Sequence, residues 1–263
     1  MRHQKNRNDK RSRKSAEQKA DLYGFHAVSH AWLNPVREVR TLYLTKQSHD
    51  GFASTLSEAR KAGINRPEPI IVDKNTIDKM VHKGAVHQGV ALCCDHLPDV
   101  FLSDLIIGAE NRDVSRVLIL DQVTDPHNVG AILRSACVFG AQAVIMQSKH
   151  APDLGGVLAK IACGAVEHMD VIYETNLSRA IESLQENGFF VYGLDERGEQ
   201  TPSEVDIAPH AALVLGAEGA GLRRLVREHC DMLLQLPSKG ALSSLNVSNA
   251  AAVALYALNT AAE

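Results

Sequence analysis

Residues 117–130 read Val-Leu-Ile-Leu-Asp-Gln-Val-Thr-Asp-Pro-His-Asn-Val-Gly, an apolar run followed at once by a polar loop. A continuous apolar run of this kind is typical of a strand buried on both faces of a parallel sheet. The loop holds residues that cap helices, and Pro126 stiffens its turn, so we expect a helix from Val129 to Phe139. A strand that leads directly into a helix is the repeating unit of α/β proteins.

Strands and helices continue to alternate through the rest of the chain. The further strands that we expect are Ala143–Met146, Val171–Tyr173, Phe189–Leu194, Ala211–Leu215 and Met232–Leu236. The further helices are Asp153–Ile161, Leu177–Glu186, Gly221–His229 and a last one from about Leu245. This alternation predicts a parallel sheet covered by helices on both faces, and we assign it to one domain, residues 114–263.

A smaller α/β unit precedes this domain and is assigned to residues 21–96. Its expected helices are Gly24–Leu33, Gly51–Ala62 and Lys74–His82, and its expected strands are Val39–Leu44, Pro69–Val72 and Val90–Cys94. Residues 97–113 form the linker between the two, with a short helix expected at Phe101–Ile107.

The first twenty residues differ in composition from the rest of the chain. Residues 1–20 hold eight Lys/Arg against two acidic residues, a net charge of +6 in a chain whose total is −3. Blocks of like charge without apolar periodicity are typical of disordered segments, so we expect a disordered basic arm. Such an arm attracts phosphates without reading sequence, and it also aids solubility; the sequence leaves both roles open.

The composition of the 263-residue chain excludes several classes of protein. Hydrophobic residues make up 45% and charged residues 22%, and no apolar run is long enough to span a membrane. The charged N-terminus has no apolar segment behind it, so we expect a cytoplasmic protein without a secretory signal or a membrane partner. The five cysteines show no CxxC spacing and the twelve histidines form no HExxH, so we expect reduced thiols and no metal site.

Ligands of open α/β sheets bind at the carboxyl ends of the strands, where three loops stand out. The first loop supplies Asn128 and leads into a helix that carries Arg134. Arg134 stands among alanine, isoleucine and leucine residues, and a half-buried arginine needs a carboxylate or phosphate partner. The alternative is an ordinary arginine on the surface of an amphipathic helix.

The second loop follows the strand Ala211–Leu215 and contains three glycines in six residues, Gly216, Gly219 and Gly221. Its G-x-x-G-x-G spacing is neither the dinucleotide fingerprint nor a phosphate-binding Walker loop. Glycines allow a ligand to approach the backbone, although a tight connection explains them equally well. Glu218, in the middle of this loop, is a candidate partner for Arg134.

The third loop runs from Leu236 to Asn249 and is rich in serine and asparagine, including Ser244 and Asn246. These residues supply hydrogen bonds and a helix cap, and the alanine-rich helix that follows permits close packing. Capping and packing alone also explain the pattern. Composition and spacing therefore predict an α/β protein with a ligand site built from three loops, and they do not define its reaction.

Taken in order, the three loops resemble the signature motifs of the SpoU/TrmH branch of the SPOUT RNA methyltransferases. The matching segments are Asn128-x-Gly130-x-x-x-Arg134-x-Ala136, Leu215-Gly216-x-Glu218-Gly219-x-Gly221-Leu222 and Ser244-Leu245-Asn246-Val247-Ser248. The first 96 residues are similar to the L30e-like domain of many members, through Gly24-Phe-His-Ala-Val28 and His87-Gln-Gly-Val90. Within the branch, the chain is most similar to members that methylate a guanosine of bacterial 23S ribosomal RNA.

This resemblance implies a parallel-sheet SPOUT domain with a C-terminal trefoil knot, preceded by an L30e-like RNA-binding domain. It implies that S-adenosylmethionine binds through the backbone near Gly216, Leu236 and Leu245. It also implies a homodimer with its active site near the subunit interface. The expected reaction is attack of a ribose 2′-oxygen of RNA on the cofactor's methyl group.

The resemblance further implies roles for five side chains as catalytic residues: Arg134, Asn128, Glu218, Ser244 and Asn246. Arginine is a poor base because it stays protonated. Our hypothesis is that Arg134 stabilises the developing alkoxide or grips a neighbouring phosphate, while the other four orient Arg134 and the ribose. The sequence does not identify the group that accepts the proton.

Three other functions compete with this interpretation. The same reaction on a transfer RNA is the nearest alternative, and residues 21–96 favour ribosomal RNA over it. A non-catalytic RNA-binding or ribosome-assembly protein is a second one, and the retention of Arg134, Glu218 and Asn246 argues against it. A nucleotide-dependent oxidoreductase is a third one, and it is disfavoured because the dinucleotide fingerprint is missing.

Overall fold

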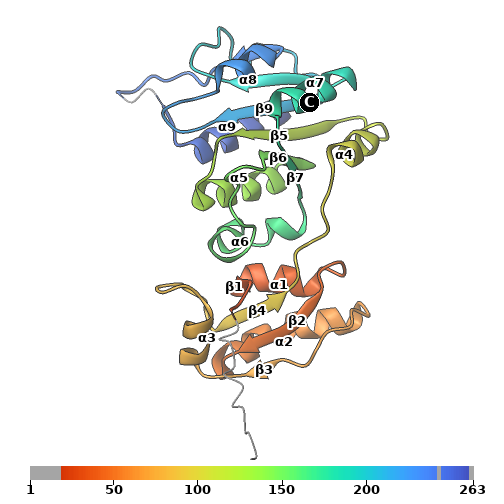
Figure 1. Ribbon diagram of the computed structural model, residues 1–263, viewed down its shortest axis with the longest axis vertical. Helices are drawn as coiled ribbons and strands as arrows, with labels where there is room; N and C mark the ends of the chain where they lie inside the picture. The colour runs from red at the N-terminus through yellow and green to blue at the C-terminus, as the bar shows by residue number, and fades with distance from the viewer. Residues whose placement is uncertain (1–18, 242–243, 261–263) are drawn as a thin grey trace, which may run out of the picture.

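The structure is a computed structural model, and it describes residues 19–241 and 244–260. The chain forms two units, each with its own sheet, stacked along the long axis of the molecule (Figure 1). Residues 1–18, most of the predicted basic arm, lie outside the described residues.

The N-terminal unit contains a four-stranded sheet in the order β1-β4-β2-β3. Its elements are β1 (Leu22–Tyr23), α1 (Phe25–Leu33), β2 (Val39–Leu44), α2 (Lys46–Lys61), β3 (Ile70–Ile71), α3 (Lys74–Met80) and β4 (Val90–Cys94). The central strand β4 runs antiparallel to both β1 and β2, whereas β2 and β3 are parallel. The sheet of this unit is therefore mixed, although helices and strands alternate along the chain, because β4 runs opposite to its two neighbours.

Buried apolar side chains of α1, α2 and the central strands form the core of the N-terminal unit. Trp32, Phe52 and Leu92 are among its largest members. Thr45 begins α2 with a capping box, which places the start of this helix five residues before the predicted Gly51. The apolar periodicity becomes visible only further along the helix, since its first turn is polar.

The C-terminal unit contains a six-stranded, fully parallel sheet in the order β10-β8-β9-β5-β6-β7. Its strands are β5 (Ser115–Asp121), β6 (Ala143–Gln147), β7 (Asp170–Glu174), β8 (Phe190–Leu194), β9 (His210–Gly216) and β10 (Met232–Leu234). The prediction of a parallel sheet is confirmed. All seven residues of β5 are buried, as expected for a strand in the middle of such a sheet.

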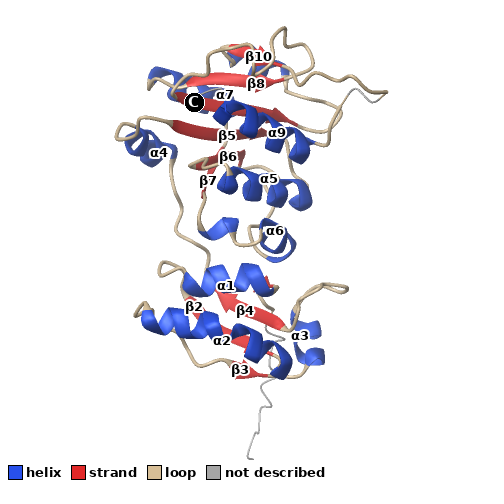
Figure 2. Cartoon of the chain, turned by 180° about the vertical axis from the view of Figure 1, so that it is seen from behind, coloured by secondary structure: helices blue, strands red, loops and turns tan. Residues whose placement is uncertain are grey.

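Helices cover both faces of this sheet (Figure 2). The helices are α4 (Leu102–Ala109), α5 (Pro126–Val138), α6 (Gly156–Ala162), α7 (Leu177–Glu186), α8 (Arg224–His229) and α9 (Val247–Thr260), with a 3-10 turn at Ala165–Glu167. Residues of α5, α6 and α9 share one apolar core, and residues of α4, α7 and α8 share the other. Helix α8 begins three residues after the predicted Gly221, because the glycine loop makes a turn of its own first.

Candidate active site

The three loops singled out in the sequence lie at one edge of the parallel sheet. β5 and β9 are neighbours in register, with Asp121 opposite Gly216, and β8 lies beside β9 with Leu194 opposite Leu215. Because the strands are parallel, their carboxyl ends and the loops that follow them meet at the same edge. The sheet therefore brings together segments more than a hundred residues apart in the chain.

Glu218 joins the three loops through hydrogen bonds. Its Oε1 accepts from Asn128 Nδ2 at 2.9 Å and from Asn246 Nδ2 at 2.5 Å. Asn246 Nδ2 also donates to Asn128 Oδ1 at 3.0 Å. We call Asn128, Glu218, Asn246 and Ser248 the motif cluster, since each of the three sequence motifs contributes to it.

Hydrogen bonds also determine how the two asparagines of the motif cluster are oriented. Asn246 Oδ1 accepts from the backbone N–H of Ser248 at 2.9 Å and from Ser248 Oγ at 2.5 Å, so its amide nitrogen must face Glu218. One N–H of Asn128 and the Oε2 of Glu218 have no partner among the described residues. The cluster therefore presents one donor and one acceptor at an exposed surface, which is what a ribose hydroxyl needs.

The glycine loop between β9 and α8 holds Glu218 in a tight turn. A Cβ atom at Gly216 would lie 2.2 Å from the carbonyl carbon of Gly221, so no side chain fits there. Gly219 and Gly221 adopt φ of +77° and +67°, a region that favours glycine. These constraints arise within the chain, so the glycines are explained as a tight connection that presents Glu218.

Asp121 is a structural residue of this edge to which sequence reasoning assigned no role. Its side chain is fully buried at the end of β5, and it accepts hydrogen bonds from the backbone N–H of Arg223 at 2.8 Å and from Arg223 Nε at 2.6 Å. The pair ties the end of the glycine loop to the central strand. A carboxylate that ends an otherwise apolar strand was the available signal, since such a group needs a buried partner.

Arg134 lies apart from the motif cluster. Its side chain is exposed on α5, and its Nη1 donates to Cys163 Sγ at 3.5 Å. Of the two interpretations that the sequence left open, the structure shows the ordinary surface arginine of an amphipathic helix, and the candidate partner Glu218 bonds Asn128 and Asn246 instead. Six residues separate Arg134 from Asn128, which in a helix is about 9 Å along the axis and about 240° around it.

Gly130, also on α5, lies where this helix packs closely against α6. A Cβ at this position would lie 2.8 Å from the carbonyl oxygen of Leu158 on α6. The close approach that the sequence suggested is therefore made by a neighbouring helix. It sets the distance between α5 and α6.

The remaining predicted residues lie on the third loop and differ in burial. Leu236 is half-buried against the core, whereas Leu245 is 53% exposed. Within the described residues, neither forms a hydrogen bond between backbone groups, so no backbone partner there uses their N–H and C=O groups. Ser244 is exposed and takes no part in the motif cluster.

Two kinds of chemistry have little support at this edge. Burial raises the pKa of Cys230, which follows α8, to about 12, so this thiol stays protonated and is a poor nucleophile. In the described part of the chain, no group of three or more His, Cys, Asp or Glu side chains is arranged to hold a metal ion. No helix there is both long and apolar enough to cross a bilayer.

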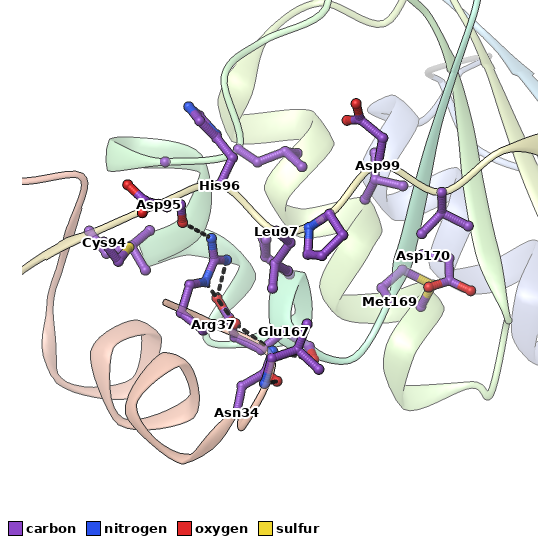
Figure 3. A pocket seen from close by; sticks show the side chains of 18 of the residues that line it. Asn34, Arg37, Cys94, Asp95, His96, Leu97, Asp99, Glu167, Met169 and Asp170 are labelled. Atoms are coloured by element: carbon purple, nitrogen blue, oxygen red, sulfur yellow. Dashed lines mark hydrogen bonds and ion pairs between the residues drawn. The ribbon is translucent and has the colours of Figure 1, made fainter. Parts of the chain in front are cut away.

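A sizeable cavity lies elsewhere in the molecule. A cavity of about 570 Å³ opens between the two units and is lined by the N-terminal unit, the linker and the segment before β7 (Figure 3). None of the motif residues lines it. The motif cluster therefore lies outside this cavity, at the loop edge of the sheet, where Glu218 and Asn246 are exposed.

The sequence profile of the SpoU rRNA methylase family matches residues 115–256. This chain belongs to that family. A second profile, described as the substrate-binding domain of RNA 2′-O ribose methyltransferases, matches residues 22–99. The chain is thus an RNA methyltransferase whose two matched regions correspond to the two sheets.

Among curated proteins, the chain is similar to two enzymes named 23S rRNA (guanosine-2′-O-)-methyltransferase RlmB. It is 38% identical to the one from Coxiella burnetii and 39% identical to the one from Pseudomonas aeruginosa, covering 89% of this chain in both cases. The matches cover 93% and 94% of those proteins.

A solved structure with the same fold is the SpoU methyltransferase AviRb of Streptomyces viridochromogenes in complex with the cofactor AdoMet. The TM-score is 0.73 at 24% identity, over 91% of this chain and 88% of that chain.

Proposed function

We propose that this protein transfers a methyl group from S-adenosylmethionine to the ribose 2′-hydroxyl of a guanosine in 23S ribosomal RNA. One observation carries the proposal: the motif cluster, in which Glu218 binds Asn128 and Asn246 from the other two signature motifs. The curated relatives named 23S rRNA (guanosine-2′-O-)-methyltransferase match 89% of this chain, which supports 23S ribosomal RNA as the substrate.

The third loop and the glycine loop suit an adenosyl group. Leu236 and the exposed Leu245, which form no backbone–backbone hydrogen bond within the described residues, would hold the adenosyl group. The turn at Gly216 closes on Gly221 of the same loop and leaves no room for a side chain there. When bound, the cofactor supplies an electrophilic methyl group on a sulfonium.

The chain's own residues would position the ribose. The second N–H of Asn128 and the Oε2 of Glu218, which have no partner within the described residues, would bind the target ribose, and Asn246 and Ser248 would keep both groups oriented. Ser244, two residues before Asn246, would contact the RNA at the rim. Arg134 has donors to spare beyond Cys163 and would grip a phosphate, since guanidinium groups bind phosphate in a bidentate way.

The homodimer belongs to this proposal. Val138 at the end of α5 is 74% exposed, and Tyr256 and Val253 on the adjoining α9 are 59% and 47% exposed. Arg134 lies one turn before Val138 on the same face, so a second copy docked on this patch would lie against Arg134. Light scattering of the wild type and of Tyr256→Asp tests it: a wild-type dimer that becomes monomeric in the variant supports the proposal, and a monomeric wild type refutes it.

The knot also belongs to this proposal. The segment after β8 lies against the chain that leaves β10: Gln235 N donates to Gln200 O at 2.9 Å, and a Cβ at Gly198 would lie 2.5 Å from the Leu234 backbone. Beyond this point the chain returns to pack α9 on α5, with Asn259 Nδ2 donating to Phe139 O at 2.7 Å. We propose that the chain passes beneath that segment as a trefoil knot, and that the N-terminal unit is L30e-like.

The test is transfer of label from S-adenosylmethionine to total ribosomal RNA or total transfer RNA of a strain lacking the gene, followed by nucleoside analysis. We expect label in 2′-O-methylguanosine of the large-subunit RNA. Label only in transfer RNA would keep the reaction and refute the substrate. Cofactor binding without transfer to naked RNA would require the assay to be repeated on precursor particles, and failure there as well would refute the activity.

A further inference from the structure

The contact between the two units is a built interface. Arg37 of the N-terminal unit and Glu167 of the C-terminal unit form an ion pair at 2.5 Å with side chains 6% and 2% exposed. Asn34 Nδ2 donates to the same carboxylate at 2.9 Å, and Arg37 Nη1 donates to the Asp95 carbonyl at 2.8 Å (Figure 3). A buried ion pair needs such additional hydrogen bonds to offset its desolvation.

A second contact lies one turn away. The His30 ring occupies the space beside Gly164, where a Cβ would lie 2.2 Å from His30 Cδ2. His30 Nδ1 is 2.8 Å from His168 Nε2. We call His30, Asn34 and Arg37 together with Gly164, Glu167 and His168 the joint.

Helix α6 connects the joint to the candidate active site. Ala159 of α6 packs into the core of the N-terminal unit, whereas Leu158 and Ala162 pack into the core of the C-terminal unit. The carbonyl of Leu158 touches α5 at Gly130, two residues from Asn128. At its other end α6 reaches Cys163, which binds Arg134.

We propose that the joint makes Arg37, Glu167 and His30 positioning residues for methyl transfer, and that the substrate is a folded RNA element long enough to contact both units at once. The inference rests on the proposed function. The joint holds the N-terminal unit at a constant offset from the motif cluster, so RNA bound by that unit presents one ribose to Glu218. No member of the joint touches the reacting atoms; they act through the relative placement of the two units.

Kinetics of three variants test the positioning role on in-vitro-transcribed 23S ribosomal RNA. The variants are Glu167→Gln, His30→Ala, and Glu228→Gln as the control, because Glu228 pairs with Arg224 on the exposed surface of α8. We expect Glu167→Gln to lower kcat at saturating RNA by about ten-fold or more, with KM for RNA changed by less than about three-fold, since misplacement by about 1 Å can cost about 100-fold. His30→Ala should lower kcat less, and Glu228→Gln should match the wild type.

A footprint separates this inference from the proposed function, because it needs no methyl transfer. Hydroxyl-radical protection of the same RNA should show sites from both units in the wild type. With Glu167→Gln, the protections due to the C-terminal unit should weaken while those due to the N-terminal unit persist. If these residues had a merely structural role, the substitutions would lower the melting temperature and leave both kcat and KM of the folded fraction unchanged.

Two results overturn the inference, whatever the outcome for the reaction. One is an unchanged footprint for Glu167→Gln and His30→Ala. The other is a kcat equal to that of Glu228→Gln in folded protein with cofactor affinity intact. Absence of transfer by the wild type itself overturns the proposed function, and the footprint then still decides the joint.

Discussion

The motif cluster and the joint are both networks of a carboxylate with nitrogen donors, yet their surroundings differ. Glu218 is exposed and keeps one oxygen without a partner among the described residues, whereas Glu167 is 2% exposed and both its oxygens are bonded. A carboxylate with unused bonding capacity at the surface can bind a ligand. A buried carboxylate whose hydrogen-bonding capacity is used within the protein has a structural role. The same chemical group therefore serves two purposes in this molecule.

The largest effect is expected from breaking the joint. Glu167→Ala leaves the buried Arg37 without its partner, which typically costs about 3–5 kcal/mol of the free energy of unfolding. Urea unfolding measures it. The double variant Arg37→Met, Glu167→Met should recover most of the loss, because an apolar pair needs no charge compensation; a loss in the double variant equal to the sum of the two single losses would contradict this account.

Breaking the motif cluster should lower activity and leave stability nearly unchanged, unlike breaking the joint. Glu218→Ala removes the acceptor shared by Asn128 and Asn246, so we expect methyl transfer to fall about 100-fold, equivalent to about 2.7 kcal/mol in the barrier. Stability should change by less than about 0.5 kcal/mol because the site is exposed. Glu218→Gln is the matched variant, and a large drop in melting temperature with either change would show that the cluster is structural.

A smaller effect tests the turn that presents Glu218. Gly216→Ala forces a Cβ against backbone atoms of Gly221, and overpacking of this kind costs about 1–3 kcal/mol. Gly219→Ala is the control, since it meets only the strain of its positive φ and nothing within 4 Å. Thermal unfolding should rank Gly216→Ala below Gly219→Ala; the reverse order would mean that the loop can open to admit a side chain.

The smallest effect concerns pH at the joint. Burial lowers the pKa of His30, the positive charges on His168 and His26 lower it further, and Glu167 and Glu58 oppose this. Between that lowered pKa and the ordinary value of about 6.5, the unfolded chain binds more protons, so stability falls as pH falls through this window. Urea midpoints at pH 7.5 and 5.5 should therefore differ more in the wild type than in His30→Ala, and equal differences would exclude His30 as the cause.

Local patterns in the chain account for the elements themselves. The fully apolar β5 predicts a strand buried on both faces, and the polar residues after it predict a helix start, because strand burial and helix capping depend on near neighbours. The three motifs likewise identify Asn128, Glu218 and Asn246, which the structure brings within hydrogen-bonding distance.

The placement of charged side chains follows from tertiary packing. Arg134 stands among apolar neighbours in the chain, yet it is exposed, because those neighbours fill the other faces of α5. Arg37 and Glu167 carry no motif and lie 130 residues apart, and only the packing of α1 against the turn after α6 buries them together. Hydrophobic periodicity identifies the face of a helix or strand that packs into a core. The partner of a buried charge depends instead on which elements come into contact, and this is decided only when the two units fold against each other.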